Sequence, residues 1–259
     1  MPIKLNVLDY APWSLSKATL ASSCSQAFKY RYVDKATSER SGSAAKVGVA
    51  VHLALELLLK EQVTSIDKAL ASAVSDDDNE LTTKEAEQVR AYYSNIQSFL
   101  DKVSAFTDKH PTKKILVEEE WGIDKYFKPC GFKDPNALFR GIVDWGLLLD
   151  SGQLIIIDHK SGRHRAVSYY GAQLDAYSVM GLSKYPTVTS IQSAIHFVKS
   201  NTVEWAAPRT AKYVTEVLRP WLEAFLNAKG NAVSEFYTNP GKACRWCDYK
   251  SICPDYSRS

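Results

Sequence analysis

The sequence lacks the features that mark secreted and membrane-spanning chains. Its longest apolar runs are far too short to cross a bilayer, and its first residues do not follow the basic, apolar and small-residue order of a signal peptide. Internal repeats and low-complexity tracts are also absent. We therefore expect a cytoplasmic protein.

An excess of charge of one sign is missing as well. The 32 Lys and Arg residues barely exceed the 29 Asp and Glu residues, which leaves a formal net charge of +3. A nucleic-acid partner is allowed, but it would have to bind a local basic surface. The 259 residues, 45% of them hydrophobic, suffice for one large α/β domain or two small ones. We favour one domain with helical additions.

Cysteine is scarce, yet three of the five cysteines lie close together near the end of the sequence. Cys244, Cys247 and Cys253 form a C-x2-C-x5-C pattern followed by proline, an ending that many iron–sulfur cysteine runs share. In a reducing compartment such a cluster indicates metal binding rather than disulfides. A fourth ligand could come from Cys24 or Cys130. We choose Cys24, which would tie an N-terminal helix to the C-terminal segment; structural zinc is the main alternative to an iron–sulfur cluster.

The most informative stretch is a predicted β-hairpin. One strand contains Gly141–Asp144, a turn-like Asp-Ser-Gly segment follows, and a β-branched run leads into Asp158–Lys160. With a three-residue loop, Asp144 lies opposite Asp158 and Lys160 shares that face. Facing carboxylates destabilise a sheet unless a cation lies between them, and oxygen ligands suit Mg²⁺ or Mn²⁺. The hairpin therefore predicts a metal-dependent catalytic site; a solvated strand edge, or a two-residue loop that separates the carboxylates, are the alternatives.

The segments before and after the hairpin carry apolar residues at helical spacing. Helices are expected over 14–33, 47–62, 65–74, 82–106, 167–182 and 210–228, and further strands over 113–123 and 190–198. Gly48, His52 and Glu56 are spaced by four, so they lie along one stripe of their helix. Gln173 and Tyr177 form an i, i+4 pair on another helix.

Further polar and aromatic residues are candidates for the site and for DNA binding. Three glutamates occupy the strand before the hairpin, where alternation puts Glu119 on the face opposite Glu118 and Glu120, and one of them could join the metal shell. Single strands favour basic grooves lined with aromatic side chains. Candidates for such a groove are Lys29, Arg31, Arg163 and Arg165, with Tyr30, Tyr32 and Trp246 as stacking surfaces.

Taken together and in order, these motifs resemble the PD-(D/E)XK nuclease superfamily, specifically its RecB-like branch with a four-cysteine iron–sulfur staple. CRISPR-associated exonucleases and the AddB nuclease domain belong to that branch. The resemblance spans nearly the whole chain, from Cys24 to Cys253, although residues 59–113 carry no motif. Val143 stands where the family name has proline, and Asp158 stands where Glu is common; neither departure removes a carboxylate.

The resemblance implies a restriction-endonuclease-like α/β core, in which a central mixed β-sheet is flanked by helices, with accessory helices and a C-terminal iron–sulfur segment. It implies that Asp144 and Asp158 bind the catalytic Mg²⁺ or Mn²⁺ and that His52 adds an imidazole ligand. Lys160 would position or activate the attacking water. The remaining implied site residues are Gln173 and Tyr177, which support the active site or contact DNA, and Cys24, Cys244, Cys247 and Cys253, which hold a 4Fe–4S cluster or zinc.

The implied protein is a single RecB-like nuclease domain over residues 1–259, in a bacterial, archaeal or phage-infected cell. Its expected parts are an N-terminal helical segment (1–46), a helical layer (47–112), a catalytic sheet core (113–200), and a helix with the cysteine cluster (201–259). The implied activity is that of a metal-dependent DNA exonuclease that acts at DNA ends and prefers single strands. The alternatives are a DNA-binding or recombination-assembly module with dispensable catalysis, and a structure-specific endonuclease of the same fold.

Overall fold

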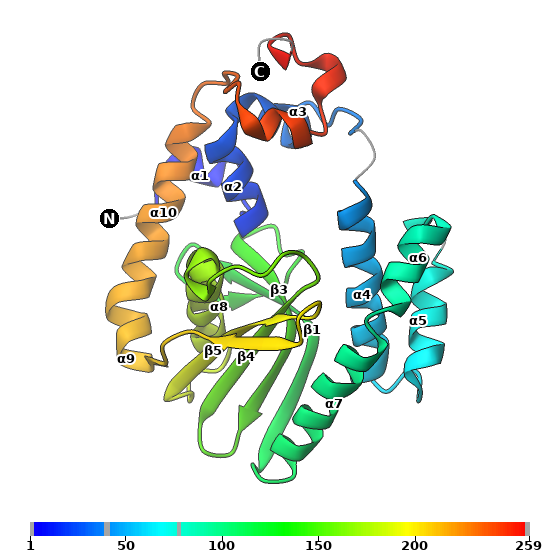
Figure 1. Cartoon of the computed structure of the whole chain (residues 1–259). Coiled ribbons are helices and arrows are strands. Elements are labelled where there is room, and N and C mark those ends of the chain that lie inside the picture. Colours follow the sequence, from blue (N-terminus) through cyan, green and yellow to red (C-terminus); the bar gives the residue numbers. More distant parts are fainter. Residues whose placement is uncertain (1–2, 39–41, 77–78, 257–259) are drawn as a thin grey trace. The chain divides into compact units, whose positions relative to one another are not determined.

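The computed structural model describes residues 3–38, 42–76 and 79–256 (Figure 1). The chain divides into two compact units. We call residues 43–120 and 142–214 the sheet unit, and residues 1–42, 121–141 and 215–259 the terminal unit. The single nuclease domain over the whole chain stays a prediction.

The chain has the mixed α/β fold that its sequence predicts, with helices flanking a central mixed sheet. The helices are α1 (Leu5–Leu8), α2 (Leu15–Ser23), α3 (Ser25–Tyr32), α4 (Ser43–Leu59), α5 (Ile66–Val74), α6 (Thr83–Arg90), α7 (Tyr93–Thr107), α8 (Gly171–Lys184), α9 (Ala211–Tyr213) and α10 (Arg219–Ala232). Shorter turns are the 3-10 helices η2 (Val167–Tyr170), η4 (Lys242–Trp246) and η5 (Lys250–Ile252), and the π-helical η3 (Val214–Leu218). Within the described ranges, no helix combines the length and apolar character that a membrane span requires.

The strands pair in the order β2-β1-β3-β4-β5-β6, and β7 also pairs with β5. Their bounds are β1 (Thr112–Asp124), β2 (Pro129–Cys130), β3 (Ala137–Leu149), β4 (Gln153–Lys160), β5 (Ser190–Phe197), β6 (Thr202–Trp205) and β7 (Arg209–Thr210). Strands β4 and β5 are parallel, whereas β3 and β4 are antiparallel.

The predicted hairpin register is confirmed. Trp145 pairs with Ile157 along β3 and β4, so the next position places Asp144 opposite Asp158. The connection is the three-residue loop 150–152, and it ends at Gly152, whose φ of 82° is a conformation that glycine adopts without steric cost.

Both faces of the sheet unit are covered by helices (Figure 1). Ile155 and Ile157 project from β4 into a core that α4, α5 and α7 complete, and Phe99 of α7 packs there against Trp145. On the other side, Leu174 of α8 packs with residues of β5. Because each buried aliphatic side chain contributes about 1.5–3 kcal/mol, these cores hold β3 and β4 firmly at the positions that carry the acidic residues.

The terminal unit is built around α1, α2, α3 and α10. Its core includes Trp13, which stacks on Phe28 with ring centroids 5.8 Å apart and donates its indole N–H to the Val7 carbonyl at 2.8 Å. The helix predicted over 14–33 is wrong as a single element, because Cys24 is extended (φ −164°, ψ 108°) and separates α2 from α3. The break lets the Ser25 hydroxyl accept the Tyr237 backbone N–H at 3.0 Å.

Other predicted helices also differ at their boundaries. The helix predicted over 82–106 divides into α6 and α7 at residues 91–92, and the one predicted over 167–182 begins with η2. Pro220 lies at the start of α10, directly after the π-helical η3, which continues from α9 without a gap, so the proline coincides with a change of helix type. Periodicity located these segments, but packing against neighbours sets their ends.

Candidate active site

Three side chains from three elements of the sheet unit meet at one point. His52 comes from α4, Glu118 from β1 and Asp144 from β3, and one ligand atom of each lies within 4.8 Å of the other two. The His52 Nδ1 atom is 3.6 Å from Asp144 Oδ2 and 3.9 Å from Glu118 Oε1. Among the side chains that the structure describes, this is the one such group, and its nitrogen and oxygen donors suit a divalent cation.

A backbone contact fixes the orientation of the His52 ring. Its Nε2 atom lies 2.9 Å from the His159 carbonyl oxygen. A carbonyl oxygen only accepts, so Nε2 carries the proton and Nδ1 of the neutral ring directs its lone pair at the two carboxylates. Burial acts to lower the pKa of His52, but Glu118 and Asp144 outweigh it and raise that pKa. A proton and a metal ion would therefore compete for the same atom.

Gly48, one turn before His52, lies close to the residue that follows β4. A Cβ atom at this position would lie 3.1 Å from the Ser161 hydroxyl oxygen, so an added side chain would require that hydroxyl to shift by a few tenths of an ångström. Glu56, one turn after His52, forms an ion pair with Lys60 at 2.7 Å and lines a hollow that His52 and Glu118 also line.

Asp144 is buried, with 9% of its surface exposed, and its Oδ2 atom accepts the His159 backbone N–H at 2.7 Å. Burial and the neighbouring Asp158 charge raise the pKa of Asp144 to about 7. Two partly uncompensated carboxylates in a buried location are unfavourable unless a cation accompanies them. The charge of the site therefore fits a metal ion.

Asp158 and Lys160 lie beside this group. Asp158 is 2% exposed, and its carboxylate contacts the Lys160 Nζ atom and the Gln173 side-chain amide, each at 2.5 Å. Burial raises the pKa of Asp158 although Lys160 opposes it, and the Asp158 charge in turn raises the pKa of Lys160 against the effect of burial. Asp158 faces Asp144 but is not one of the three residues whose ligand atoms meet.

Gln173 and Tyr177 of α8 extend the network away from the acidic group. The Gln173 amide also donates to the Tyr177 hydroxyl at 3.1 Å, and that hydroxyl donates to the Ile142 carbonyl of β3 at 2.7 Å. Gln173 therefore touches an acidic residue directly, whereas Tyr177 acts through Gln173 and the β3 backbone.

Glu118 is the residue of this group to which the sequence alone assigned no definite role. Its φ is 47°, an uncommon value for a residue with a side chain, and it interrupts the regular alternation of β1. Glu119 instead binds Lys114 at 2.7 Å and Lys184 at 3.2 Å. The run of three acidic residues indicated a ligand, and the position of the Glu118 carboxylate beside His52 and Asp144 points to Glu118.

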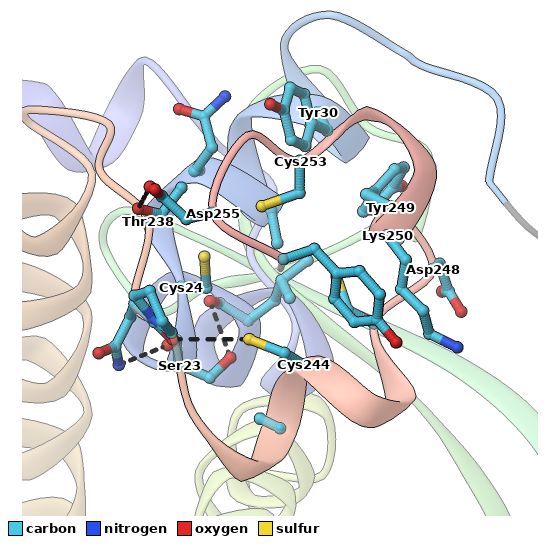
Figure 2. A pocket seen from close by; sticks show the side chains of 18 of the residues that line it. Ser23, Cys24, Tyr30, Thr238, Cys244, Asp248, Tyr249, Lys250, Cys253 and Asp255 are labelled. Atoms are coloured by element: carbon cyan, nitrogen blue, oxygen red, sulfur yellow. Dashed lines mark hydrogen bonds between the residues drawn. The ribbon is translucent and has the colours of Figure 1, made fainter. Parts of the chain in front are cut away.

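The four cysteines predicted to bind one cluster line a single cavity of about 240 Å³ in the terminal unit. Figure 2 shows Cys24, Cys244 and Cys253 turned toward its interior. Cys247 also lines it, and burial together with the charges of the other three thiols raises the pKa of Cys247 although a backbone hydrogen bond opposes the rise. Cys130 is not among the lining residues, and all five thiols are free.

The chain matches a known protein family and is similar to solved structures. The chain matches the model of the PD-(D/E)XK nuclease superfamily over residues 12–254. Among solved structures it is similar to a "Putative exonuclease" from Eubacterium rectale, with 13% identity, a TM-score of 0.49, and coverage of 93% of this chain and 90% of that one. It is also similar to SSO0001, with 14% identity, a TM-score of 0.33, and coverage of 96% and 95%. The comparison with curated proteins gave no match.

Proposed function

The chain belongs to the PD-(D/E)XK nuclease superfamily, and we propose that it is a metal-dependent DNA exonuclease of the RecB-like branch. It would hydrolyse phosphodiester bonds at DNA ends and prefer single strands. The observation that carries the proposal is the meeting of His52, Glu118 and Asp144 beside the Asp158–Lys160 pair. The order of the motifs along the chain supports the RecB-like assignment.

The residues have complementary roles in this proposal. His52, Glu118 and Asp144 would hold Mg²⁺ or Mn²⁺, with Asp158 as the second acid of the family motif. The ion supplies charge neutralisation at the phosphate and lowers the pKa of a bound water. Lys160 is held at the Asp158 carboxylate, where its ammonium can orient a water molecule and stabilise developing negative charge. Gln173 and Tyr177 keep Asp158 and β3 in position.

The test is cleavage of end-labelled linear and circular single-stranded DNA by anaerobically purified protein with Mg²⁺ or Mn²⁺. We expect loss of linear DNA only, with no loss in chelator or in Asp158→Ala. Asp150→Asn, which alters an exposed carboxylate at the tip of the same hairpin, is the matched control and should retain activity.

Each other outcome contradicts part of the proposal. Cleavage of circles would indicate an endonuclease. Cleavage that persists when both Asp144 and Asp158 are replaced by Ala would show that this acidic site does not catalyse the reaction. An absence of cleavage on either substrate would favour a DNA-binding module, and faster digestion of duplexes would contradict the single-strand preference.

We further propose that Cys24, Cys244, Cys247 and Cys253 hold a 4Fe–4S cluster. Their common cavity supports this set over one with Cys130. The proline that directly follows Cys253 supports an iron–sulfur cluster over zinc, because many iron–sulfur cysteine runs share this ending.

Cys24→Ser and Cys130→Ser form a matched pair for this proposal. Anaerobically purified wild-type protein and Cys130→Ser should contain iron and acid-labile sulfide and absorb visible light. Cys24→Ser should lose most of the iron. A colourless wild-type protein that contains zinc, or equal iron in the two variants, would overturn the assignment.

A further inference from the structure

The loop that follows Lys160 is held in place by polar contacts within the sheet unit. The Ser161 carbonyl accepts the Tyr92 hydroxyl at 3.0 Å. Farther along, the Glu204 carboxylate pairs with His164 Nε2 at 2.6 Å and accepts the Val167 backbone N–H at 3.1 Å. The loop is therefore anchored near its start, its middle and its end, although its side chains face solvent.

Arg163 and Arg165 are exposed on either side of the anchored His164. Arg163 lines a hollow of about 680 Å³ together with Lys199 and Tyr92. Arg165 turns to the next element, η2, and its guanidinium carbon lies 4.3 Å from the centre of the Tyr169 ring. Two permanent positive charges thus follow the Asp158–Lys160 segment directly.

An aromatic pair links Arg165 to Lys160. The rings of Tyr169 and Tyr170 meet edge to face, with centroids 5.1 Å apart, and the Tyr170 ring lies 5.6 Å from Lys160 Nζ. Tyr170 is half-buried against Phe197, whereas Tyr169 is 64% exposed. These contacts connect Lys160 through Tyr170 to Tyr169, an accessible aromatic ring that Arg165 also contacts.

We propose that Tyr169 is a stacking platform for an unpaired base next to the phosphate that is cleaved, with Arg165 beside it to bind the neighbouring backbone. This inference rests on the proposed function. Base faces are occupied by neighbouring pairs inside a duplex but are accessible in a single strand, and an aromatic ring beside cationic groups is the usual way to bind such bases. Tyr169 would then determine the preference for single strands.

The test is fluorescence anisotropy with a labelled single-stranded oligonucleotide, in chelator so that cleavage plays no part. Tyr169→Ala should bind at least about fivefold more weakly, because stacking on an aromatic side chain contributes about 1–3 kcal/mol per base. Tyr169→Phe should bind like wild type. Tyr126→Ala is the matched control, since Tyr126 is 63% exposed, has Lys125 Nζ 5.2 Å from its ring centre, and lies in the terminal unit.

A second measurement separates stacking from a general loss of affinity. An oligonucleotide without bases should bind wild type and Tyr169→Ala equally. The substitution should weaken the binding of a blunt duplex much less than the binding of a single strand. Unchanged binding by Tyr169→Ala, an equal loss on the baseless strand, or no binding of single strands by wild type would overturn the inference. If Tyr169-dependent binding is found without any cleavage in Mg²⁺, the nuclease proposal fails and the stacking role stands.

Discussion

Replacing Asp144 with Asn should make the metal-free protein more stable at neutral pH while abolishing its nuclease activity. The Asp144 carboxylate is buried beside Asp158, and both effects penalise its ionised form. The Asn side chain has nearly the same shape, and its amide oxygen can still accept the His159 backbone N–H. The substitution therefore removes the charge without removing the hydrogen bond.

The size of the expected gain in stability follows from the pKa shift of Asp144. Folding raises the pKa of Asp144 from 3.8 to about 7, and each pKa unit corresponds to about 1.36 kcal/mol. Between these two pH values the folded state binds more protons than the unfolded state, so the free energy of unfolding falls as pH rises. Asp144 thus destabilises the metal-free fold by about 4 kcal/mol above pH 7, and by much less at pH 5.

Urea unfolding in chelator at pH 5 and pH 8 measures this difference. The stability advantage of Asp144→Asn over wild type should grow by about 2–3 kcal/mol between these pH values. Asp150→Asn, at the exposed tip of the hairpin, should show no such growth. Added Mg²⁺ should stabilise wild type through binding to the folded state, and it should have a smaller effect on Asp144→Asn.

Two results would refute this reasoning. Lower stability of Asp144→Asn at pH 8 in chelator would mean that the carboxylate contributes favourably without a metal. A stability difference that does not change with pH would mean that Asp144 does not titrate between the two pH values. Either result would mean that the ionised Asp144 carboxylate is not what destabilises the metal-free fold.

Three further substitutions test the surroundings of the site. Tyr177→Phe should lower the free energy of unfolding by about 0.5–1.5 kcal/mol in urea denaturation, because the part-buried Ile142 carbonyl of β3 loses its hydrogen-bond donor. Glu118→Ala should weaken Mn²⁺ binding about tenfold or more in calorimetric titration, an effect of the size that altered metal-site residues commonly cause, whereas Glu119→Ala should bind Mn²⁺ like wild type. Gly146→Ala should lower the melting temperature, because its Cβ would lie 2.5 Å from the Ile155 carbonyl oxygen.

The hairpin and its acidic pair were predictable because their signals are local. Side chains alternate along an extended strand with a period of two, and the length of the loop fixes the register. The Asp-Ser-Gly turn therefore suffices to predict that Asp144 faces Asp158, without any information on tertiary contacts. The position of His52 needed the family resemblance, because no local rule tells which distant strand a helix will contact.

The break at Cys24 was not predictable from periodicity. Residues 14–33 carry apolar positions at helical spacing, but the segment around Tyr237 offers Ser25 and Gln26 hydrogen-bond partners that require α3 to start anew. Tertiary contacts override weak helical preferences of this kind. The same break turns Cys24 toward the cavity that Cys244 and Cys253 also line (Figure 2), so the deviation from a regular helix coincides with the expected cofactor site.

The side-chain direction of Glu118 could not be predicted from the alternation of residues along a strand. Alternation assigns a side chain to a face only while the backbone stays extended, and a φ of 47° at Glu118 changes the direction of that side chain within β1. A conformation of this kind costs on the order of 1–3 kcal/mol for a residue other than glycine, and such costs concentrate at functional sites. Glu118 carries that cost at the point where its carboxylate meets His52 and Asp144. A binding role explains the strain better than a purely structural role, because glycine would be more stable at this φ but could bind no cation.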